Sequence, residues 1–136
     1  MDGPARAVER FELSPQTGLL GPDGHILSTQ DFAGTNAVMM ADLAQRFAIA
    51  PSDLTQSGFV AGSMFYVRRE LVADVTDETI PLSGFDLEQG QIDGTLAHAM
   101  ERVFGALVMA RGYKVASLGN FIQQPEPLRR GAYQYV

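Results

Sequence analysis

The chain contains no cysteine. This absence excludes disulfide frameworks, thiolate zinc sites and cysteine nucleophiles. Because disulfides are a feature of secreted domains, their absence favours a cytoplasmic location.

Basic residues are scarce as well. The 10 Lys and Arg residues stand against 16 Asp and Glu residues, which gives a formal net charge of −6. The Lys/Arg clusters are no longer than the pairs Arg68-Arg69 and Arg129-Arg130. A nucleic-acid backbone would find little positive charge to bind, so nucleic acid is not predicted as a partner.

Long apolar runs are also missing. A membrane-spanning helix needs about 20 consecutive apolar residues, and no segment of the chain approaches that length. The N-terminal string MDGPARAVERF carries charges where a signal peptide needs an apolar run. The sequence therefore predicts no direct membrane span.

The chain does have enough apolar residues for a core, with a hydrophobic fraction of 46% over 136 residues. We predict one domain over residues 1–122 and a C-terminal tail over residues 123–136, where a Pro-containing sequence has no strong period.

Helical periodicity is present in two segments. An apolar residue recurs every four positions within residues 36–47, and Thr35 or Asn36 can cap a helix there. The segment after Asp93 carries a longer apolar line and predicts a long, largely buried helix. Arg6 to Phe11 is predicted to be the end of a further helix.

Strand candidates alternate with these helices. Leu19-Leu20 and residues 115–118 are short apolar segments near turn residues, and residues 59–67 are apolar on both alternate faces, which predicts a central strand covered on both sides. Pro51 and the two residues after it are predicted to form a turn. The alternation predicts an α/β fold with a small sheet and flanking helices, and a mixed α+β arrangement stays open.

Two uncommon strings carry a family resemblance. They are FVAGSMFYVRREL at residues 59–71 and EQGQIDGTLAHAMERVFG at residues 88–105. The strings TGLLGPDGH and, at residues 34–36, GTN precede them in the same order. Over roughly residues 6–120 the chain resembles the C-terminal portion of the rhamnan synthesis protein F family of bacterial cell-surface polysaccharide proteins.

The resemblance implies glycosyltransferase chemistry in the synthesis of a rhamnan, lipopolysaccharide O-antigen or related polymer, on a GT-A fold. Such an enzyme binds a nucleotide sugar in an N-terminal half, commonly with a divalent metal ion held by an Asp-x-Asp pair. No such pair occurs in this chain. The resemblance therefore implies the acceptor-side half of that fold, with no metal ligand assigned and no cofactor evident in the chain itself.

Inverting glycosyl transfer needs a carboxylate near the acceptor hydroxyl. Within the acidic segment at residues 85–93, the resemblance implies Asp93 as the candidate catalytic base, with Glu88 as a second catalytic candidate. Asp93 also stands at the start of the predicted long helix, where an Asp at the N-cap is the alternative interpretation.

Three polar residues of that helix, His98, Glu101 and Arg102, fall on one stripe together with Gly105. The resemblance makes the three candidates for binding substrate in a cleft, and a solvated helix face is the alternative. One His and one Glu at this spacing are too few for a metal site.

The remaining candidates for substrate binding lie in the first string. Gly62 and Ser63 interrupt an apolar segment, either because a sugar approaches the backbone or because of packing. Arg68 follows that segment and can meet a phosphate or carboxylate, and an ion pair with Glu70 or Asp74 is the alternative.

Two functions stay open at this point. One is a glycosyltransferase-like domain that lacks the nucleotide-sugar-binding half and is inactive by itself. The other is a non-catalytic module that binds glycan or docks in an assembly. The predicted partner is a polysaccharide acceptor, together with a donor-binding domain or a second copy that pairs with an open sheet edge.

Overall fold

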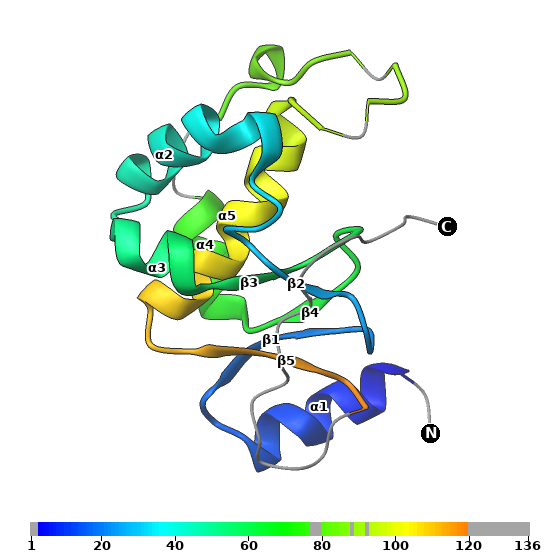
Figure 1. Cartoon of the computed structure of the whole chain (residues 1–136). Coiled ribbons are helices and arrows are strands. Elements are labelled where there is room, and N and C mark those ends of the chain that lie inside the picture. Colours follow the sequence, from blue (N-terminus) through cyan, green and yellow to red (C-terminus); the bar gives the residue numbers. More distant parts are fainter. Residues whose placement is uncertain (1–2, 77–79, 88, 92, 120–136) are drawn as a thin grey trace.

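A computed structural model describes residues 3–76, 80–87, 89–91 and 93–119. These residues form a mixed α/β fold, which confirms the predicted fold class (Figure 1). The helices are α1 (Gly3–Leu13), α2 (Ala37–Arg46), α3 (Pro51–Gln56), α4 (Arg69–Thr76) and α5 (Leu96–Ala110), with short 3-10 turns η1 (Gly34–Asn36) and η2 (Leu82–Gly84). The strands are β1 (Thr17–Gly21), β2 (Ile26–Ser28), β3 (Gly58–Val60), β4 (Tyr66–Val67) and β5 (Lys114–Ser117).

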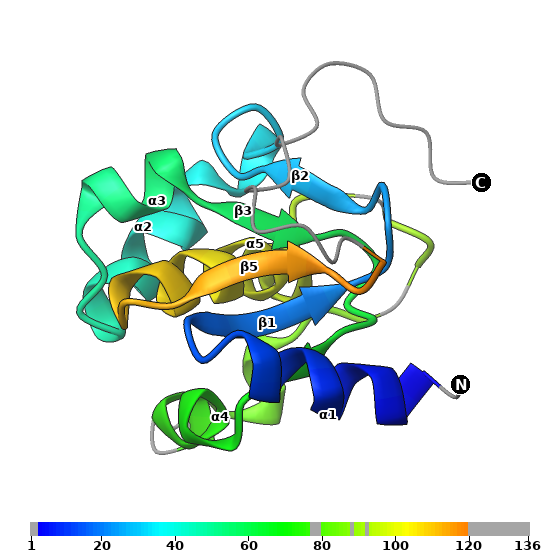
Figure 2. The same cartoon turned by 90° about the horizontal axis from the view of Figure 1, so that it is seen from below.

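The strands form two small sheets. In the three-stranded sheet, β1 lies between β4 and β5, antiparallel to β4 and parallel to β5. Leu19 pairs with Val67 on one side and with Val115 on the other. The second sheet is the antiparallel pair of β2 and β3. Figure 2 shows β1 and β5 side by side with their arrowheads at the same end.

Helix α5 is the centre of the packing. Figure 1 shows it above the strands, with α2 and α3 on its far side and α1 below the sheet. The main core cluster joins apolar residues of α2 and α5, such as Leu43, Val103 and Leu107. Gly105 lets α5 lie directly on β3, because a Cβ at this position would overlap the carbonyl oxygen of Gly58. A larger residue would force the helix away from the sheet.

The predicted periodic elements are confirmed. Residues 36–47 contain α2, and the segment after Asp93 forms the long buried helix α5. Leu19-Leu20 lies in β1, residues 115–118 overlap β5, and the predicted helix end at Arg6 to Phe11 lies in α1. None of the helices in the described part of the chain is long and apolar enough to cross a membrane.

The single strand predicted for residues 59–67 is wrong. β3 ends at Val60 and β4 begins at Tyr66, and the two strands belong to different sheets. Between them the backbone takes positive φ values of 86° at Gly62 and 54° at Ser63. A left-handed backbone at two consecutive residues ends an extended strand, so this segment is a turn between two strands.

The turn predicted after Pro51 is also wrong. Pro51 is the first residue of α3, a position where its fixed φ and its missing N–H suit a helix. The predicted C-terminal tail at residues 123–136 lies outside the described residues.

Candidate functional site

Asp93 lies in the loop before α5 and joins this loop to residues 34–36. Its carboxylate accepts hydrogen bonds from the backbone N–H of Thr35 at 3.0 Å, from the N–H of Gly94 at 2.9 Å and from Nδ2 of Asn36. Gly34 packs directly against this carboxylate. Its φ is +55°, and a side chain at this position would place a Cβ that overlaps the carboxylate. The GTN string is thus shaped around the Asp93 side chain.

Asn36 completes this connection. Its Oδ1 accepts a hydrogen bond from the N–H of Gly94 at 3.0 Å, while its Nδ2 also donates to the carbonyl of Ala33 at 3.1 Å. Asn36 occupies the N-cap position of α2, but its side chain makes no capping hydrogen bond there. The side chain is directed to the Asp93 loop instead, although the residue is fully buried at 0% exposure.

Asp93 is not the N-cap of α5, so that alternative interpretation is wrong. The N-cap is Thr95, whose side-chain oxygen accepts a hydrogen bond from the N–H of His98. The same oxygen lies 2.6 Å from Nδ1 of His98. Because Thr95 caps the helix, the Asp93 carboxylate is available to bind the 34–36 loop.

The carboxylate of Asp93 is stabilised in its charged form. Burial acts to raise the pKa of Asp93, but the hydrogen bonds from Thr35, Gly94 and Asn36 act in the opposite direction. The positive charge of Arg102 adds to them, and the pKa of Asp93 lies below its ordinary value. Asp93 is therefore ionised at neutral pH.

Arg102 is the buried cation beside this carboxylate. Its residue exposure is 5%, and its Nη2 lies 3.9 Å from Oδ1 of Asp93. Its Nε donates to the carbonyl of Phe32 at 2.7 Å, and its Nη1 donates to the carbonyl of His98 at 2.9 Å. The guanidinium carbon also lies 5.3 Å from the ring centre of Phe59. Arg102 thus ties α5 to the segment before η1.

Glu101 connects the same helix to the first family string. Its Oε1 accepts hydrogen bonds from the N–H of Gly62 at 2.7 Å and from the hydroxyl of Ser63 at 3.1 Å. Its Oε2 lies 3.4 Å from Nη1 of Arg102. The interpretation of this stripe as a solvated helix face is wrong, because Arg102 and Gly105 are buried and Glu101 faces the turn at residues 61–63.

These contacts bring most of the predicted site residues together. We call this set the Asp93 network: Thr35, Asn36, Asp93, Gly94, Glu101 and Arg102, with Gly62 and Ser63 bound to Glu101. His98 lies at its edge. Sequence reasoning missed Asn36 as a partner of Asp93, although the GTN string was a signal that this loop is more than a helix start.

Arg68 lies elsewhere in the molecule. Its Nε donates to the carbonyl of Thr17 at 2.7 Å, and its Nη2 donates to the carbonyls of Phe11 at 2.9 Å and Ser14 at 3.3 Å. The guanidinium also lies over the rings of Phe11 and Tyr113. It joins the end of α1 to β1, and its role as a ligand contact stays a prediction. Glu88 falls outside the described residues.

A divalent cation does not fit the described part of the chain. Among the side chains that the structure describes, no group of three or more Asp, Glu or His residues can hold a metal ion. The carboxylate of Asp93 is directed to N–H donors and a guanidinium, which are not metal-binding groups. We therefore derive no step through a metal at this site.

Comparison with known proteins gives a small number of relatives. No family model matches the chain, and no solved structure is detectably similar to it. The uncharacterized protein WxcX from two strains of Xanthomonas campestris pv. campestris is 40% identical to it over 119 residues. This alignment covers 85% of the chain and 17% of WxcX, so the chain spans about a sixth of the length of these curated relatives.

Proposed function

We propose that the chain is the acceptor-side part of a bacterial glycosyltransferase that acts in the synthesis of a cell-surface polysaccharide. One observation supports this proposal most. The two strings that resemble the rhamnan synthesis protein F family meet in space, because Glu101 of the second string binds Gly62 and Ser63 of the first. The GTN string joins the same site through Asp93. Strings that are far apart in the sequence thus build one connected network.

In this proposal Asp93 orients the acceptor. Three hydrogen bonds from the chain occupy its carboxylate, which offers about four lone-pair sites. A fourth site can accept a hydrogen bond from a sugar hydroxyl, since the side chain of Asp93 keeps 32% of its surface exposed. Its lowered pKa makes it a weak base, so orientation of the hydroxyl is the larger part of its role.

The nucleotide-sugar donor and any divalent metal belong to another domain or chain in this proposal. Positioning of the donor supplies a large part of the rate of such a transfer, so the isolated chain is expected to be inactive. The absence of cysteine favours the cytoplasm as the location.

A second function is supported by the contacts of Arg102 in the Asp93 network, which are made with other groups of the same chain. Arg102 donates to two backbone carbonyls and lies beside two carboxylates, so its guanidinium is used within the chain. A network that only fastens loops would suit a non-catalytic module that binds glycan or docks in an assembly.

The first experiment is calorimetric titration of the chain with nucleotide-diphosphate sugars, with and without manganese, and then with rhamnose-containing oligosaccharides. We expect the oligosaccharides to bind and the nucleotide sugars not to bind. Asp93→Asn should weaken oligosaccharide binding, and Asp42→Asn, a change at an exposed position of α2, serves as the matched control. Binding of nucleotide sugars would contradict the assignment to the acceptor side.

A transfer assay separates the two functions. WxcX that lacks its 119 matched residues is incubated with a labelled nucleotide sugar and the oligosaccharide, and the chain is added in trans. Transfer that depends on the chain supports the glycosyltransferase, and binding without transfer supports the glycan-binding module.

A further inference from the structure

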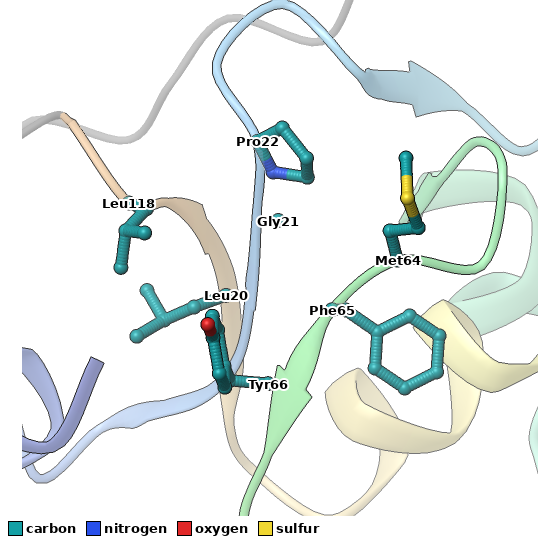
Figure 3. A pocket seen from close by; sticks show the side chains of 7 residues that line it. All are labelled: Leu20, Gly21, Pro22, Met64, Phe65, Tyr66 and Leu118. Carbon is teal, nitrogen blue, oxygen red and sulfur yellow. The ribbon is translucent and has the colours of Figure 1, made fainter. Parts of the chain in front are cut away.

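A pocket of about 440 Å³ lies at the end of the three-stranded sheet, and Figure 3 shows the side chains around it. Its lining is uncharged, and the hydroxyl of Tyr66 is the polar side-chain group among the lining residues. Sugar hydroxyls need several hydrogen-bonding partners when they leave water. The pocket supplies few such partners, so the orientation of an acceptor hydroxyl has to be explained at the Asp93 network.

The two oxygens of the Asp93 carboxylate have different surroundings. Oδ1 accepts hydrogen bonds from Nδ2 of Asn36 and from the N–H of Gly94 at 2.9 Å, and it lies 3.9 Å from Nη2 of Arg102. Among the described residues, one N–H donor reaches Oδ2, that of Thr35 at 3.0 Å. Each oxygen of an ionised carboxylate accepts about two hydrogen bonds. Oδ1 is therefore fully used within the chain, whereas Oδ2 has one lone pair left.

Burial follows the same division between the two oxygens. Asn36 and Arg102, on the side of Oδ1, are 0% and 5% exposed. Gly34 and Thr35, on the side of Oδ2, are both exposed. Gly34 lies so close to Oδ2 that an added Cβ would overlap it. The lone pair that the chain does not use thus belongs to the oxygen beside exposed residues.

The side chain of Asn36 fixes this orientation of the carboxylate. Its Nδ2 donates to Oδ1 of Asp93, while its own Oδ1 accepts a hydrogen bond from the N–H of Gly94 at 3.0 Å. Nδ2 also donates to the carbonyl of Ala33 at 3.1 Å. A flipped amide would place its oxygen against the carboxylate and this carbonyl, so a single orientation satisfies all three contacts.

We propose that Asn36 is a positioning residue that directs a hydroxyl of the acceptor glycan to Oδ2 of Asp93. This inference rests on the proposed function, which supplies glycan as the ligand class. Asn36 is buried and acts through Asp93: it occupies Oδ1 and leaves the second oxygen for the hydroxyl. The hydroxyl donates its hydrogen to Oδ2, which orients the acceptor oxygen for the transfer.

Two-dimensional amide NMR of the unmodified chain, titrated with rhamnose-containing oligosaccharides, tests which oxygen is used. The N–H of Thr35 shares Oδ2 with the expected hydroxyl, whereas the N–H of Gly94 and Nδ2 of Asn36 bind Oδ1. We therefore expect the Thr35 signal to shift more than the Gly94 signal and the side-chain signals of Asn36. A larger shift at Gly94 would overturn the inference.

Asn36→Asp tests the positioning role with a side chain of nearly the same shape. A carboxyl group at this position still accepts from Gly94, but it donates to Asp93 only when it is protonated. Two adjacent carboxylates share a proton more readily than one alone, so acid restores the missing donor. We expect binding of the oligosaccharide to be weaker by about tenfold at about pH 8 and to recover to within about threefold at about pH 5.

The comparison with the unmodified chain isolates the new carboxyl group. Arg102 of α5 faces the pair, Glu101 lies beside Arg102 and His98 lies at the edge, and all three are the same in both proteins. Gln45→Glu adds the same charge at an exposed position of α2 and should leave the affinity unchanged at both pH values.

The carboxyl carbon signal of Asp93 in Asn36→Asp gives a second measurement that needs no glycan. We expect the pKa of Asp93 to be higher than in the unmodified chain, because the two carboxyl groups share a proton. An unchanged titration, or an equal loss of binding at both pH values in a chain that stays folded, would overturn the positioning role. If the variant does not fold, the amide titration of the unmodified chain decides.

Failure of the inference can be told from failure of the proposed function. Glycan binding that shifts other residues but leaves Thr35 and Gly94 unchanged would overturn the inference and leave the proposed function intact. No binding of any glycan would contradict the proposed function itself.

Discussion

Arg102 and Arg68 each hold two distant segments of the chain together, but their surroundings differ in charge. Arg102 is 5% exposed, donates to the carbonyls of Phe32 and His98, and lies near two carboxylates. Arg68 is half-buried, donates to carbonyls at the end of α1 and the start of β1, and lies over two aromatic rings. Arg102 thus interacts with charged side chains as well as with backbone carbonyls, whereas the hydrogen bonds of the Arg68 side chain described above go to backbone carbonyls.

This difference indicates that Arg102 belongs to a candidate binding site, whereas Arg68 has a structural role. The carboxylate of Asp93 keeps exposed surface, and the carboxylate of Glu101 binds the turn at Gly62 and Ser63, so a change in charge at Arg102 reaches both. The carbonyls bound by Arg68 connect the end of α1 to the first residue of β1. We therefore expect substitutions near Arg102 to change ligand binding and stability together, and substitutions at Arg68 to change stability alone.

Removal of Arg102 should give the largest loss of stability. Arg102→Leu leaves Asp93 and Glu101 without their cation, and breaking a buried ion pair from one side costs about 3–5 kcal/mol. Arg68→Leu leaves only part-buried carbonyls that water can reach, so we expect about 1–3 kcal/mol. Urea unfolding measures both free energies. Equal losses would contradict the distinction between the two regions.

Gly34→Ala should be the next largest change. The backbone at Gly34 has a φ of +55°, and the new Cβ would overlap the carboxylate of Asp93. Gly24→Ala is the matched control, because Gly24 has a φ of +76° and nothing within 4 Å of an added Cβ. The control should lose about 1–2 kcal/mol from backbone strain alone. Gly34→Ala should lose about 1–3 kcal/mol more because of overpacking, and thermal or urea unfolding checks the difference.

Helices α2 and α5 could be predicted from the sequence because the buried face of each helix requires apolar residues at a regular period. This period can be recognised without knowledge of the rest of the fold. The sequence did not show whether Glu101 and Arg102 face solvent or other groups of the protein. A polar stripe on a helix looks the same whether it faces water or the polar groups of a loop, and the loop partners come from residues 32–36 and 61–63. The network became visible only when the fold placed these loops against α5.

The prediction of a single strand at residues 59–67 was wrong for another reason. Met64 and Tyr66 are exposed in this segment, but in the sequence they look the same as the apolar residues of a covered strand. Glycine in this segment was a signal of a break, but the positive φ at Ser63 follows from tertiary contacts with Glu101. The backbone preference of Ser predicts a negative φ, so the positive φ at this position could not be predicted from the residue type alone.

Acid should weaken the Arg102 region and spare the Arg68 region. The pKa of Asp93 is lowered in the folded protein, so the folded state binds fewer protons than the unfolded state around the ordinary value of 3.8. The stability that Asp93 contributes is complete above that pH and is lost as the pH falls through the lower, folded-state pKa. Asp93→Asn should cost about 1–3 kcal/mol at neutral pH and reduce this loss in acid.

Unfolding measured from pH 7 to pH 2 checks this dependence. Asp42→Asn is the control, because Asp42 forms an exposed pair with Arg46 within α2 and should change the profile little. An unchanged acid profile in Asp93→Asn would show that other carboxylates control the acid loss. In Arg68→Leu the shape of the profile should match that of the unmodified chain.

The smallest expected effect is at Ser63, where two terms oppose each other. Ser63→Gly relieves the left-handed backbone, a gain of about 1–2 kcal/mol, but loses the hydrogen bond to Glu101, a cost of about 0.5–1.5 kcal/mol. Ser63→Ala loses the hydrogen bond and keeps the strain, so it should be destabilising. The difference between the two variants in urea unfolding measures the backbone strain that the Glu101 contact holds in the turn. If Ser63→Ala is as stable as Ser63→Gly, the turn carries no such strain.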